Sequence, residues 1–273
     1  MIRFKKQALA IFIVLVIALI LLYRTIQFSH ENNDVLIPIL IYHNFDYNIT
    51  KKLLPTTITP DEFDEQIKYL TSNGYKGITL SQLYNYVQGR EKLPPKPFIV
   101  TMDDGYYSNY KYSYPILKKY NTPGTIFVAT ALIGRHVYTP MFTWEQAKEM
   151  ESSGFIEIQN HSNSHGRQDK LSYDELKKNV MDAQKMIDDN LGKRQVKVFA
   201  YPGGRCNEYT RNMLKELGIN IQMTGLNGIA SRHSDLSNLK RLSVKHNMTG
   251  RDIVNKIEIQ KTVSTIKKFV NIN

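Results

Sequence analysis

The sequence contains little cysteine: Cys206 is the single cysteine among 273 residues. One thiol cannot form an internal disulfide, so a fold held together by disulfides is excluded. Cys206 follows Pro202 and Gly203, but no residue pattern around it resembles a thiol hydrolase, and we expect a small buried side chain rather than a nucleophile. The sequence also lacks low-complexity blocks and repeats of fixed period, which excludes repeat architectures.

The sequence lacks every common signature of nucleic acid binding, although it is basic. Its 36 lysine and arginine residues exceed its 25 acidic residues and give a formal net charge of +11. Such a surface suits nucleic acid, the face of an anionic bilayer or an acidic cell-wall polymer. Because no recognition helix, zinc finger or RNA-binding aromatic motif is present, we expect no nucleic acid partner. The length and the 42% hydrophobic content fit one globular domain with short appendages.

One long apolar run is present, from Ala8 to Tyr23, and Arg3, Lys5 and Lys6 precede it. It is slightly shorter than the roughly 20 residues that a spanning helix prefers, although flanking aromatic and cationic side chains can extend it. The residues after it offer neither a small-x-small cleavage site nor a lipoprotein cysteine, so we expect an uncleaved membrane anchor rather than a signal peptide. The positive charge before the run places the N-terminus in the cytoplasm.

These features predict three segments: residues 1–28 as a basic cytoplasmic start and membrane anchor, 29–34 as a linker, and 35–273 as the folded domain. The domain then lies outside the cell membrane, or is secreted if the anchor is cleaved.

Within the predicted domain, apolar runs typical of strands alternate with helical segments. The expected strands are Val35–Tyr42, Phe98–Met102, Thr125–Ala129, Phe155–Gln159, Val196–Tyr201, Ile219–Met223 and Arg241–Val244. Helix starts are marked by Thr59 and Ser172, each followed three positions later by a glutamate, as in a capping box. Repeated strand-helix units imply a parallel sheet, open or closed into a barrel, with the active site at the carboxyl ends of the strands.

Two adjacent acids, Asp103 and Asp104, follow the apolar run Pro97–Val100, and Gly105 comes next. A strand end followed by a glycine turn places both carboxylates near one small volume. Adjacent like charges are unfavourable unless they share a cation or a proton. Taken alone, an Asp-Asp-Gly sequence also fits an ordinary turn.

Two histidines, His161 and His165, follow another such run, Phe155–Gln159. Histidines four positions apart lie on the same side of a helical turn and can converge on one metal ion, although the pair alone fits a polar surface loop equally well. With Asp104 they make a His-His-carboxylate set that leaves positions open for water and substrate. Together, the two segments favour a metal centre with Asp103 as a spare carboxylate for general-base work.

These segments resemble the motifs of the polysaccharide deacetylases of carbohydrate esterase family 4, whose catalytic unit is the NodB homology domain. The likeness runs from roughly Val35 to the C-terminus. The family's first motif, Thr-Phe-Asp-Asp-Gly, corresponds to Thr101–Gly105, and its second, His-Ser/Thr-x-x-x-His or close variants, to His161–His165. The resemblance implies a distorted (β/α) barrel of parallel strands that removes acetyl groups hydrolytically from N-acetylglucosamine units of peptidoglycan or another extracellular polysaccharide. It also implies a divalent metal, usually zinc, held by Asp104, His161 and His165, with metal-bound water as nucleophile and Asp103 as general base.

The family's third motif, Phe-Arg-Pro-Pro-Tyr-Gly, corresponds to Phe199–Gly204, where Ala200 replaces the arginine that orients the base in most members. The Tyr-Pro-Gly version of this motif and the segment Ile41-Tyr42-His43 resemble the branch that deacetylates poly-N-acetylglucosamine. The resemblance assigns substrate contacts to Tyr201, Pro202 and Gly203, and the backbone N–H of Tyr201 would help to stabilise the oxyanion. The alternative for Tyr201 is an ordinary aromatic residue of the wall.

The catalytic acid has two candidates. The family's last motif is an apolar strand that ends in histidine, which Leu242–His246 matches and which points to His246. The competitor is His43, which also follows a strand and otherwise contacts the substrate or supports a ligand by a hydrogen bond. Trp144 offers a face for stacking on a sugar ring, or is a core tryptophan at the start of a helix.

Two other functions are compatible with the same motifs. The first is an esterase that acts on O-acetyl groups of glycans. The second is an inactive member that only binds glycan, for which the missing arginine at Ala200 is the single support.

Overall fold

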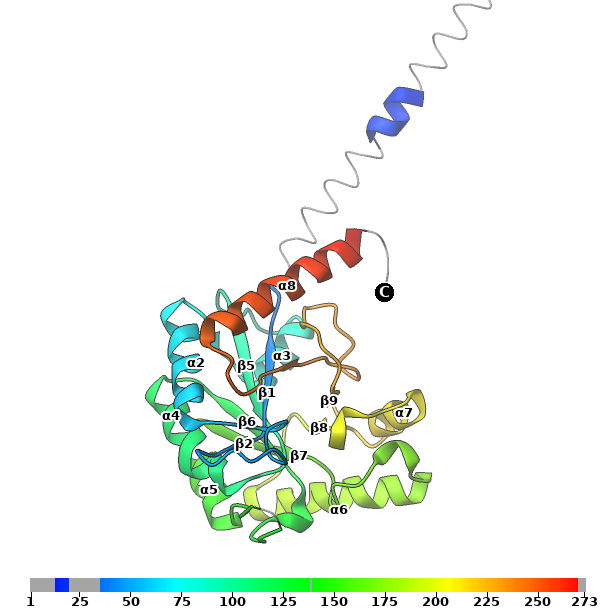
Figure 1. Ribbon diagram of the computed structural model, residues 1–273. Coiled ribbons are helices and arrows are strands. Elements are labelled where there is room, and N and C mark those ends of the chain that lie inside the picture. Colours follow the sequence, from blue (N-terminus) through cyan, green and yellow to red (C-terminus); the bar gives the residue numbers. More distant parts are fainter. Residues whose placement is uncertain (1–12, 20–34, 138, 270–273) are drawn as a thin grey trace, which may run out of the picture. The chain divides into compact units, whose positions relative to one another are not determined.

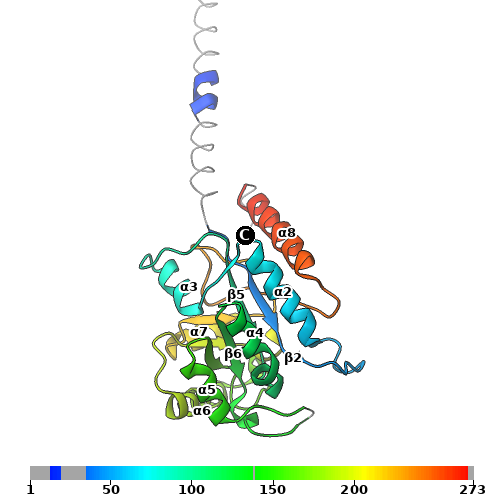
Figure 2. The same ribbon diagram turned by 90° about the vertical axis from the view of Figure 1, so that its left-hand side faces the viewer.

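Figures 1 and 2 show a computed structural model of the chain, which describes residues 13–19, 35–137 and 139–269. One compact unit spans Val35–Lys261; the other comprises residues 1–34 and 262–273. Most of the predicted anchor lies outside the described residues, and only 13–19 of it are described, as a helix. Among the described residues, no helix combines the length and apolar character needed to cross a bilayer.

The larger unit is built on a parallel sheet with the strand order β10-β1-β5-β6-β7-β8-β9. Each run predicted as a strand overlaps one of these strands, with bounds that agree to within a few residues, whereas the short strands β2, β3 and β4 were not predicted. Strands β5, β6 and β8 are buried along their whole length, as expected for parallel strands covered on both faces. The bounds are β1 (Ile39–Tyr42), β2 (Asn44–Phe45), β3 (Thr57–Ile58), β4 (Lys76–Gly77), β5 (Pro97–Met102), β6 (Gly124–Val128), β7 (Ile156–Asn160), β8 (Val198–Ala200), β9 (Ile221–Met223) and β10 (Leu242–Ser243).

The sheet curls into an incomplete barrel. A parallel bridge joins Met223 of β9 to Leu239, which lies shortly before β10, so the two ends of the strand order approach each other. Next to this bridge, the N–H of Thr224 donates to the carbonyl of Leu239 at 2.9 Å. The curled parallel sheet agrees with the predicted distorted barrel.

Helices α2, α4, α5, α6 and α7 follow one another around the sheet, and α2 contacts α4, α5 contacts α6, and α6 contacts α7 (Figures 1 and 2). The capping boxes predicted at Thr59 and Ser172 are both present. The bounds are α2 (Pro60–Ser72), α3 (Leu80–Val87), the π-helix η1 (Asn109–Ser113), α4 (Tyr114–Lys119), η2 (Thr130–Leu132), α5 (Trp144–Ser152), η3 (Gln168–Lys170), α6 (Tyr173–Leu191), η4 (Pro202–Gly204), α7 (Glu208–Glu216) and α8 (Gly250–Phe269).

The side chains of β5 alternate between two buried clusters, and this alternation positions the site. Phe98, Val100 and Met102 pack in one cluster, whereas Ile99 packs in the other together with Ile39. Because side chains alternate along a strand, the residue that follows Met102 belongs to the same side as Ile99. The acid after β5 is therefore directed to the side of the sheet that holds the second cluster.

Glu62 connects the start of α2 to the loop after β10. Its carboxylate accepts hydrogen bonds from the backbone N–H of Thr59 at 2.7 Å and of Asn247 at 2.6 Å, and lies 2.9 Å from Nδ1 of His246. Burial raises the pKa of Glu62, but these hydrogen bonds outweigh it and hold the pKa below its ordinary value. The carboxylate therefore stabilises the fold above its unfolded pKa, and this contribution is lost as the pH falls through the folded pKa.

We expect Glu62→Gln to lower the free energy of unfolding by about 1–2 kcal/mol at about pH 7, because the capping and loop contacts lose their charged acceptor. The difference from wild type should shrink as the pH falls to about 3, because protonation removes the charge that Gln lacks. Urea unfolding at the two pH values measures it. Glu216→Gln, at the exposed end of α7, serves as the control and should leave stability unchanged. A stability loss for Glu62→Gln that is equal at both pH values would contradict the role of the charge.

Candidate metal centre

The carboxyl ends of β1, β5 and β7 bring the candidate residues to one edge of the sheet. Tyr42 of β1 is paired with Met102 of β5, so His43 and Asp103 follow neighbouring strands at the same level. Asn160 of β7 is paired with Phe199 of β8, which sets His161 beside the end of β8. Parallel pairing therefore gathers side chains from distant parts of the chain.

Asp104, His161 and His165 form a compact group. Oδ1 of Asp104 lies 3.3 Å from Nε2 of His161 and 2.9 Å from Nε2 of His165. The three possible ligand atoms all lie within 4.8 Å of one another. His161 is 1% exposed, whereas Asp104 and His165 line a cavity of 380 Å³. The structure thus brings the three predicted ligands together, with two of them open to a cavity.

The donor atoms of this group fit a divalent metal ion. Nδ1 of His161 lies 2.7 Å from the carbonyl oxygen of Ala200; as a donor in that bond, it leaves the lone pair on Nε2 for a cation. Burial raises the pKa of Asp104, but hydrogen bonds from His161 and His165 outweigh it and hold the pKa well below its ordinary value. Two imidazole nitrogens and one ionised carboxylate are the donors of an open, catalytic type of zinc site.

The two histidines converge for a reason other than the predicted helical turn. Strand β7 ends at Asn160, and the following loop holds Ser162 and His165 in left-handed conformations, with φ of 70° and 58°. The side chain of Asn160 accepts from the N–H of Ser162 at 2.8 Å, and Oγ of Ser162 accepts from the N–H of His165 at 3.1 Å. The ring centroids of His161 and His165 lie 5.1 Å apart. A tight loop, and not a helix, therefore positions the pair.

Asp103 binds the buried guanidinium of Arg241, which was not predicted as a site residue. Nη1 of Arg241 donates to Oδ1 of Asp103 at 2.7 Å and Nη2 donates to Oδ2 at 2.8 Å, and the two side chains are 1% and 4% exposed. Arg241 also donates from Nε to the carbonyl of Thr224 at 3.2 Å. Burial raises the pKa of Asp103, but the attraction of Arg241 helps to outweigh it and holds the pKa below its ordinary value.

Arg241 supplies the guanidinium contact that the motif at Ala200 lacks. It directly precedes β10, which pairs with β1 on the side of the sheet away from β8. In the sequence, the only indication that Arg241 belongs to the site was its place as a basic residue at the start of a predicted strand. Which acid it meets depends on strand order, so the pair could not be predicted from the motif.

Of the two histidine candidates for the acid, the structure brings His43 to the centre. Burial lowers the pKa of His43, while the charges of Asp103 and Asp104 raise it and those of Arg241 and His161 lower it, with a net decrease. The ring of His246 instead lies against α2, with Nδ1 2.9 Å from Glu62. The structure thus places His43, and not His246, among the charges of the ligand set, because the loop after β10 turns towards α2.

The predicted substrate contact of Tyr201 is wrong. Tyr201 is fully buried, and its hydroxyl donates to Oε1 of Gln222 at 2.7 Å. Its backbone N–H donates to the carbonyl of Met223 at 3.0 Å, so it is unavailable to an oxyanion. Pro202 is also buried, and only Gly203 of this motif is exposed. The motif at the end of β8 contributes to the barrel wall instead of presenting an aromatic face.

Trp144, at the first position of α5, is partly buried and packs against the core, which favours the core alternative over sugar stacking. The cavity of the metal centre is lined instead by Tyr106, among other residues. Burial raises the pKa of Tyr106, and its hydrogen bond to Asp104 raises it further, so the phenol keeps its proton. The position of Tyr106, two residues after Asp104, could have identified it from the sequence as a residue of this cavity.

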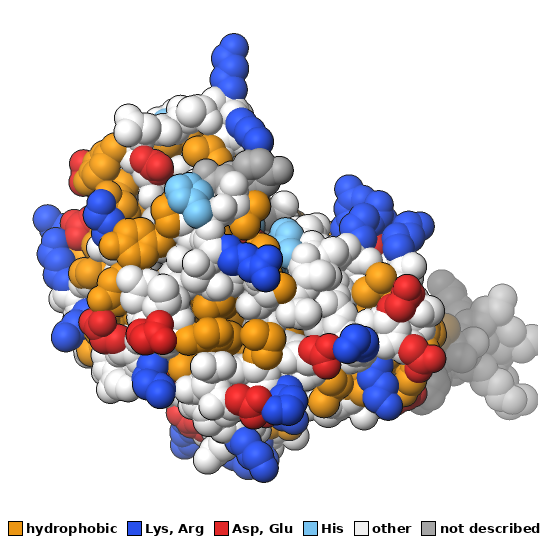
Figure 3. Space-filling model, turned by 90° about the horizontal axis from the view of Figure 1, so that it is seen from below, with side chains coloured by type: hydrophobic (Ala, Val, Ile, Leu, Met, Phe, Trp, Pro, Cys, Tyr) orange, Lys and Arg blue, Asp and Glu red, His pale blue; other side chains and the backbone are white. Residues whose placement is uncertain are grey.

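Lysine and arginine side chains are scattered over the face seen in Figure 3, with acidic and hydrophobic side chains between them. The basic side chains form no continuous patch on this face, so it offers no extended positively charged surface.

A curled (β/α) barrel with an open ligand set and a buried acid at its carboxyl edge defines a hydrolase of the metal-binding type. Residues 90–221 match the family model described as polysaccharide deacetylase. YxkH of Bacillus subtilis, which is provisionally named a polysaccharide deacetylase, is 32% identical over 214 residues, covering 78% of this chain and 73% of that protein. The chain belongs to the polysaccharide deacetylase family and is an enzyme, as the motifs indicated.

Other relatives carry more specific names. The poly-β-1,6-N-acetyl-D-glucosamine N-deacetylase of Staphylococcus aureus is 29% identical over 189 residues, covering 65% of this chain and 64% of that protein. The solved structure of the Streptococcus pyogenes deacetylase PplD in complex with acetate has a TM-score of 0.75 and 28% identity, covering 82% of this chain and 99% of that one. IcaB from Ammonifex degensii has a TM-score of 0.70 and 26% identity, covering 81% and 97%.

Proposed function

We propose that the chain hydrolyses the N-acetyl groups of N-acetylglucosamine units in a cell-wall or extracellular polysaccharide and releases acetate. The observation that carries this proposal is the ionised Asp103 next to the ligand set of Asp104, His161 and His165. The Staphylococcus aureus relative, named for poly-β-1,6-N-acetyl-D-glucosamine, supports an N-acetylated polymer as the substrate class.

Asp104, His161 and His165 would hold a divalent cation, and we propose zinc because this donor set suits it. A cation there supplies Lewis-acid chemistry for the acetamide carbonyl and acidifies a water molecule. Asp103 takes a proton from the attacking water; its carboxylate has about four lone-pair sites, of which Arg241 uses two. His43 donates a proton to the leaving nitrogen, and the lowered pKa of the buried ring makes its protonated form a stronger acid.

We expect His43→Gln to lower kcat for acetate release by about 10²-fold, because the leaving nitrogen loses its proton donor. His246→Gln should stay within about twofold of wild type, since its ring binds Glu62 away from the ligands. Acetate release under saturating substrate measures both, with bound metal determined in parallel. A larger loss for His246→Gln than for His43→Gln would return the acid to His246.

The proposed reaction is tested by acetate release from N-acetylglucosamine oligomers, peptidoglycan and an O-acetylated glycan at matched metal. We expect release from an N-acetylated substrate. Release from the O-acetyl ester alone would replace the proposal by an esterase. Binding of glycan without release of acetate would favour the inactive alternative. The one support for that alternative is the missing arginine at Ala200, and this support is weakened because Arg241 contacts Asp103 instead.

We also propose that the enzyme is held at the cell membrane with its catalytic domain outside, on the basis of the apolar run Ala8–Tyr23 and the cations before it. In cells that express the full chain, it should sediment with membranes and be digested by protease added to intact protoplasts. A variant without residues 1–28 serves as the control and should leave the membrane fraction. Protection of the full chain from external protease would contradict this orientation.

A further inference from the structure

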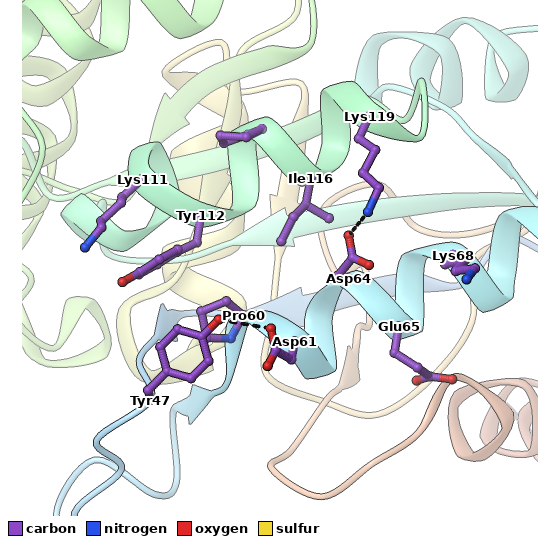
Figure 4. Close-up of a pocket in the computed structure, with 11 residues that line it drawn as sticks. Tyr47, Pro60, Asp61, Asp64, Glu65, Lys68, Lys111, Tyr112, Ile116 and Lys119 are labelled. Carbon is purple, nitrogen blue, oxygen red and sulfur yellow. Dashed lines mark hydrogen bonds and ion pairs between the residues drawn. The ribbon is translucent and has the colours of Figure 1, made fainter.

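We propose that a groove leading from the metal centre to Tyr47 and Tyr112 binds further sugar units of a neutral, N-acetylated polysaccharide chain. This inference rests on the proposed function and deepens it: the reacting unit occupies the metal centre while other units of the same polymer lie along the groove. The outer end of this groove, which we call the tyrosine subsite, is formed by Tyr47, Tyr112 and Lys111 (Figure 4).

Three hollows follow one another along the surface. The cavity of 380 Å³ that Asp104 and His165 line has Thr139 in its wall, and Thr139 also lines a second hollow of 310 Å³. Lys111 and Tyr112 line this second hollow and also a third of 640 Å³, which reaches α2. Shared walls make the three hollows neighbours, so an extended polymer can occupy them in succession.

A tyrosine lines each of the three hollows: Tyr106 the first, Tyr107 and Tyr112 the second, and Tyr112 and Tyr47 the third. Aromatic rings with a polar tip suit a sugar, which has apolar C–H faces and hydroxyl groups at its edge. Tyr47 keeps 55% of its surface exposed, and its ring centroid lies 6.1 Å from that of Tyr112. Its hydroxyl donates to Asp61 at 2.9 Å, which fixes the ring in place before a ligand arrives.

The charges around the tyrosine subsite favour an uncharged sugar. Asp64 forms an ion pair with Lys119 at 2.8 Å, and Figure 4 shows both this pair and the bond between Tyr47 and Asp61. Glu65, the third acid of this hollow, accepts from the backbone N–H of Gly250 at 2.8 Å. The Lys111 ammonium lies 4.7 Å from the centre of the Tyr112 ring. Three acids and three lysines line this hollow, so their formal charges cancel and an uncharged sugar meets no net charge there.

One consequence follows for the reaction. An oligomer long enough to reach the tyrosine subsite gains binding energy that a short oligomer cannot gain, so kcat/KM should rise with chain length.

The experiment compares kcat/KM for acetate release from short and long N-acetylglucosamine oligomers. We expect Tyr47→Ala to lower kcat/KM for the long oligomer about 10-fold relative to kcat/KM for the short one, which is the size expected for the loss of one aromatic contact. Tyr209→Ala, at another half-exposed tyrosine on α7, is the matched control and should leave the ratio unchanged. An equal loss on all lengths, or no loss, would overturn the subsite.

Calorimetric binding to the metal-free chain separates this inference from the proposed function. Tyr47→Ala should weaken binding of a long N-acetylglucosamine oligomer about 10-fold whether or not the enzyme releases acetate. If the wild-type chain released acetate from no oligomer, the proposed function would be wrong. The binding comparison between wild type and Tyr47→Ala would still show whether the tyrosine subsite binds sugar. Tighter binding of the fully deacetylated oligomer than of the acetylated one would contradict the preference for a neutral chain.

Discussion

Replacing Asp103 with asparagine is expected to reduce kcat for acetate release about 10³-fold while the bound metal stays near the wild-type amount. The amide keeps the shape of the side chain and one acceptor for Arg241, but it cannot take a proton from water. The test measures acetate release and metal content of the purified chain on the same preparation.

Asp104→Asn is the matched control for this prediction, since the two acids are adjacent in the sequence. Its amide oxygen is a weaker ligand beside His161 and His165, so metal content should fall together with activity. If Asp103→Asn lost the metal and Asp104→Asn retained it, the two acids would have to exchange roles.

Removal of the Arg241 guanidinium is expected to affect both stability and chemistry. Arg241→Ala leaves the carboxylate of Asp103 buried without its partner, which should lower the free energy of unfolding by about 3–5 kcal/mol. Arg241→Lys keeps the charge but loses the two-pronged contact, so its loss should be smaller. Urea unfolding measures the stability of both variants against wild type.

The activity of Arg241→Ala should carry a signature that a purely structural role would not produce. Burial raises the pKa of Asp103, and the guanidinium is the main group that counteracts this effect. Without the guanidinium the pKa should rise, so the acidic limb of the pH–rate profile should move to higher pH. Arg194, which pairs with Glu151 at 2.6 Å, provides a control. Arg194→Ala should lower stability and leave the profile in place; an unshifted profile in Arg241→Ala would show that Arg241 does not tune the base.

The strands could be predicted because burial on both faces demands apolar residues in sequence. Every predicted run overlaps a strand, and the capping residues Thr59 and Ser172 begin helices where expected. The two-residue strands β2, β3 and β4 were missed, since they are too short to show any periodicity.

The site was predicted only in part. The residues Asp103, Asp104, His161 and His165 are short-range motifs at strand ends, and the structure brings them together. Tyr201 was misplaced because its neighbours in sequence do not reveal that its hydroxyl and its N–H are both engaged inside the barrel wall.

By itself, the sequence determined what each strand end offers: a pair of acids after β5, two histidines after β7 and one histidine after β1. These are local properties, set by residues within a few positions of one another. Only the tertiary structure decided that Arg241 meets Asp103, that His43 rather than His246 lies among the charges of the acids, and that three hollows share lining residues. Such contacts depend on the order and register in which distant strands pair, and strand pairing is not written in any one stretch of the chain.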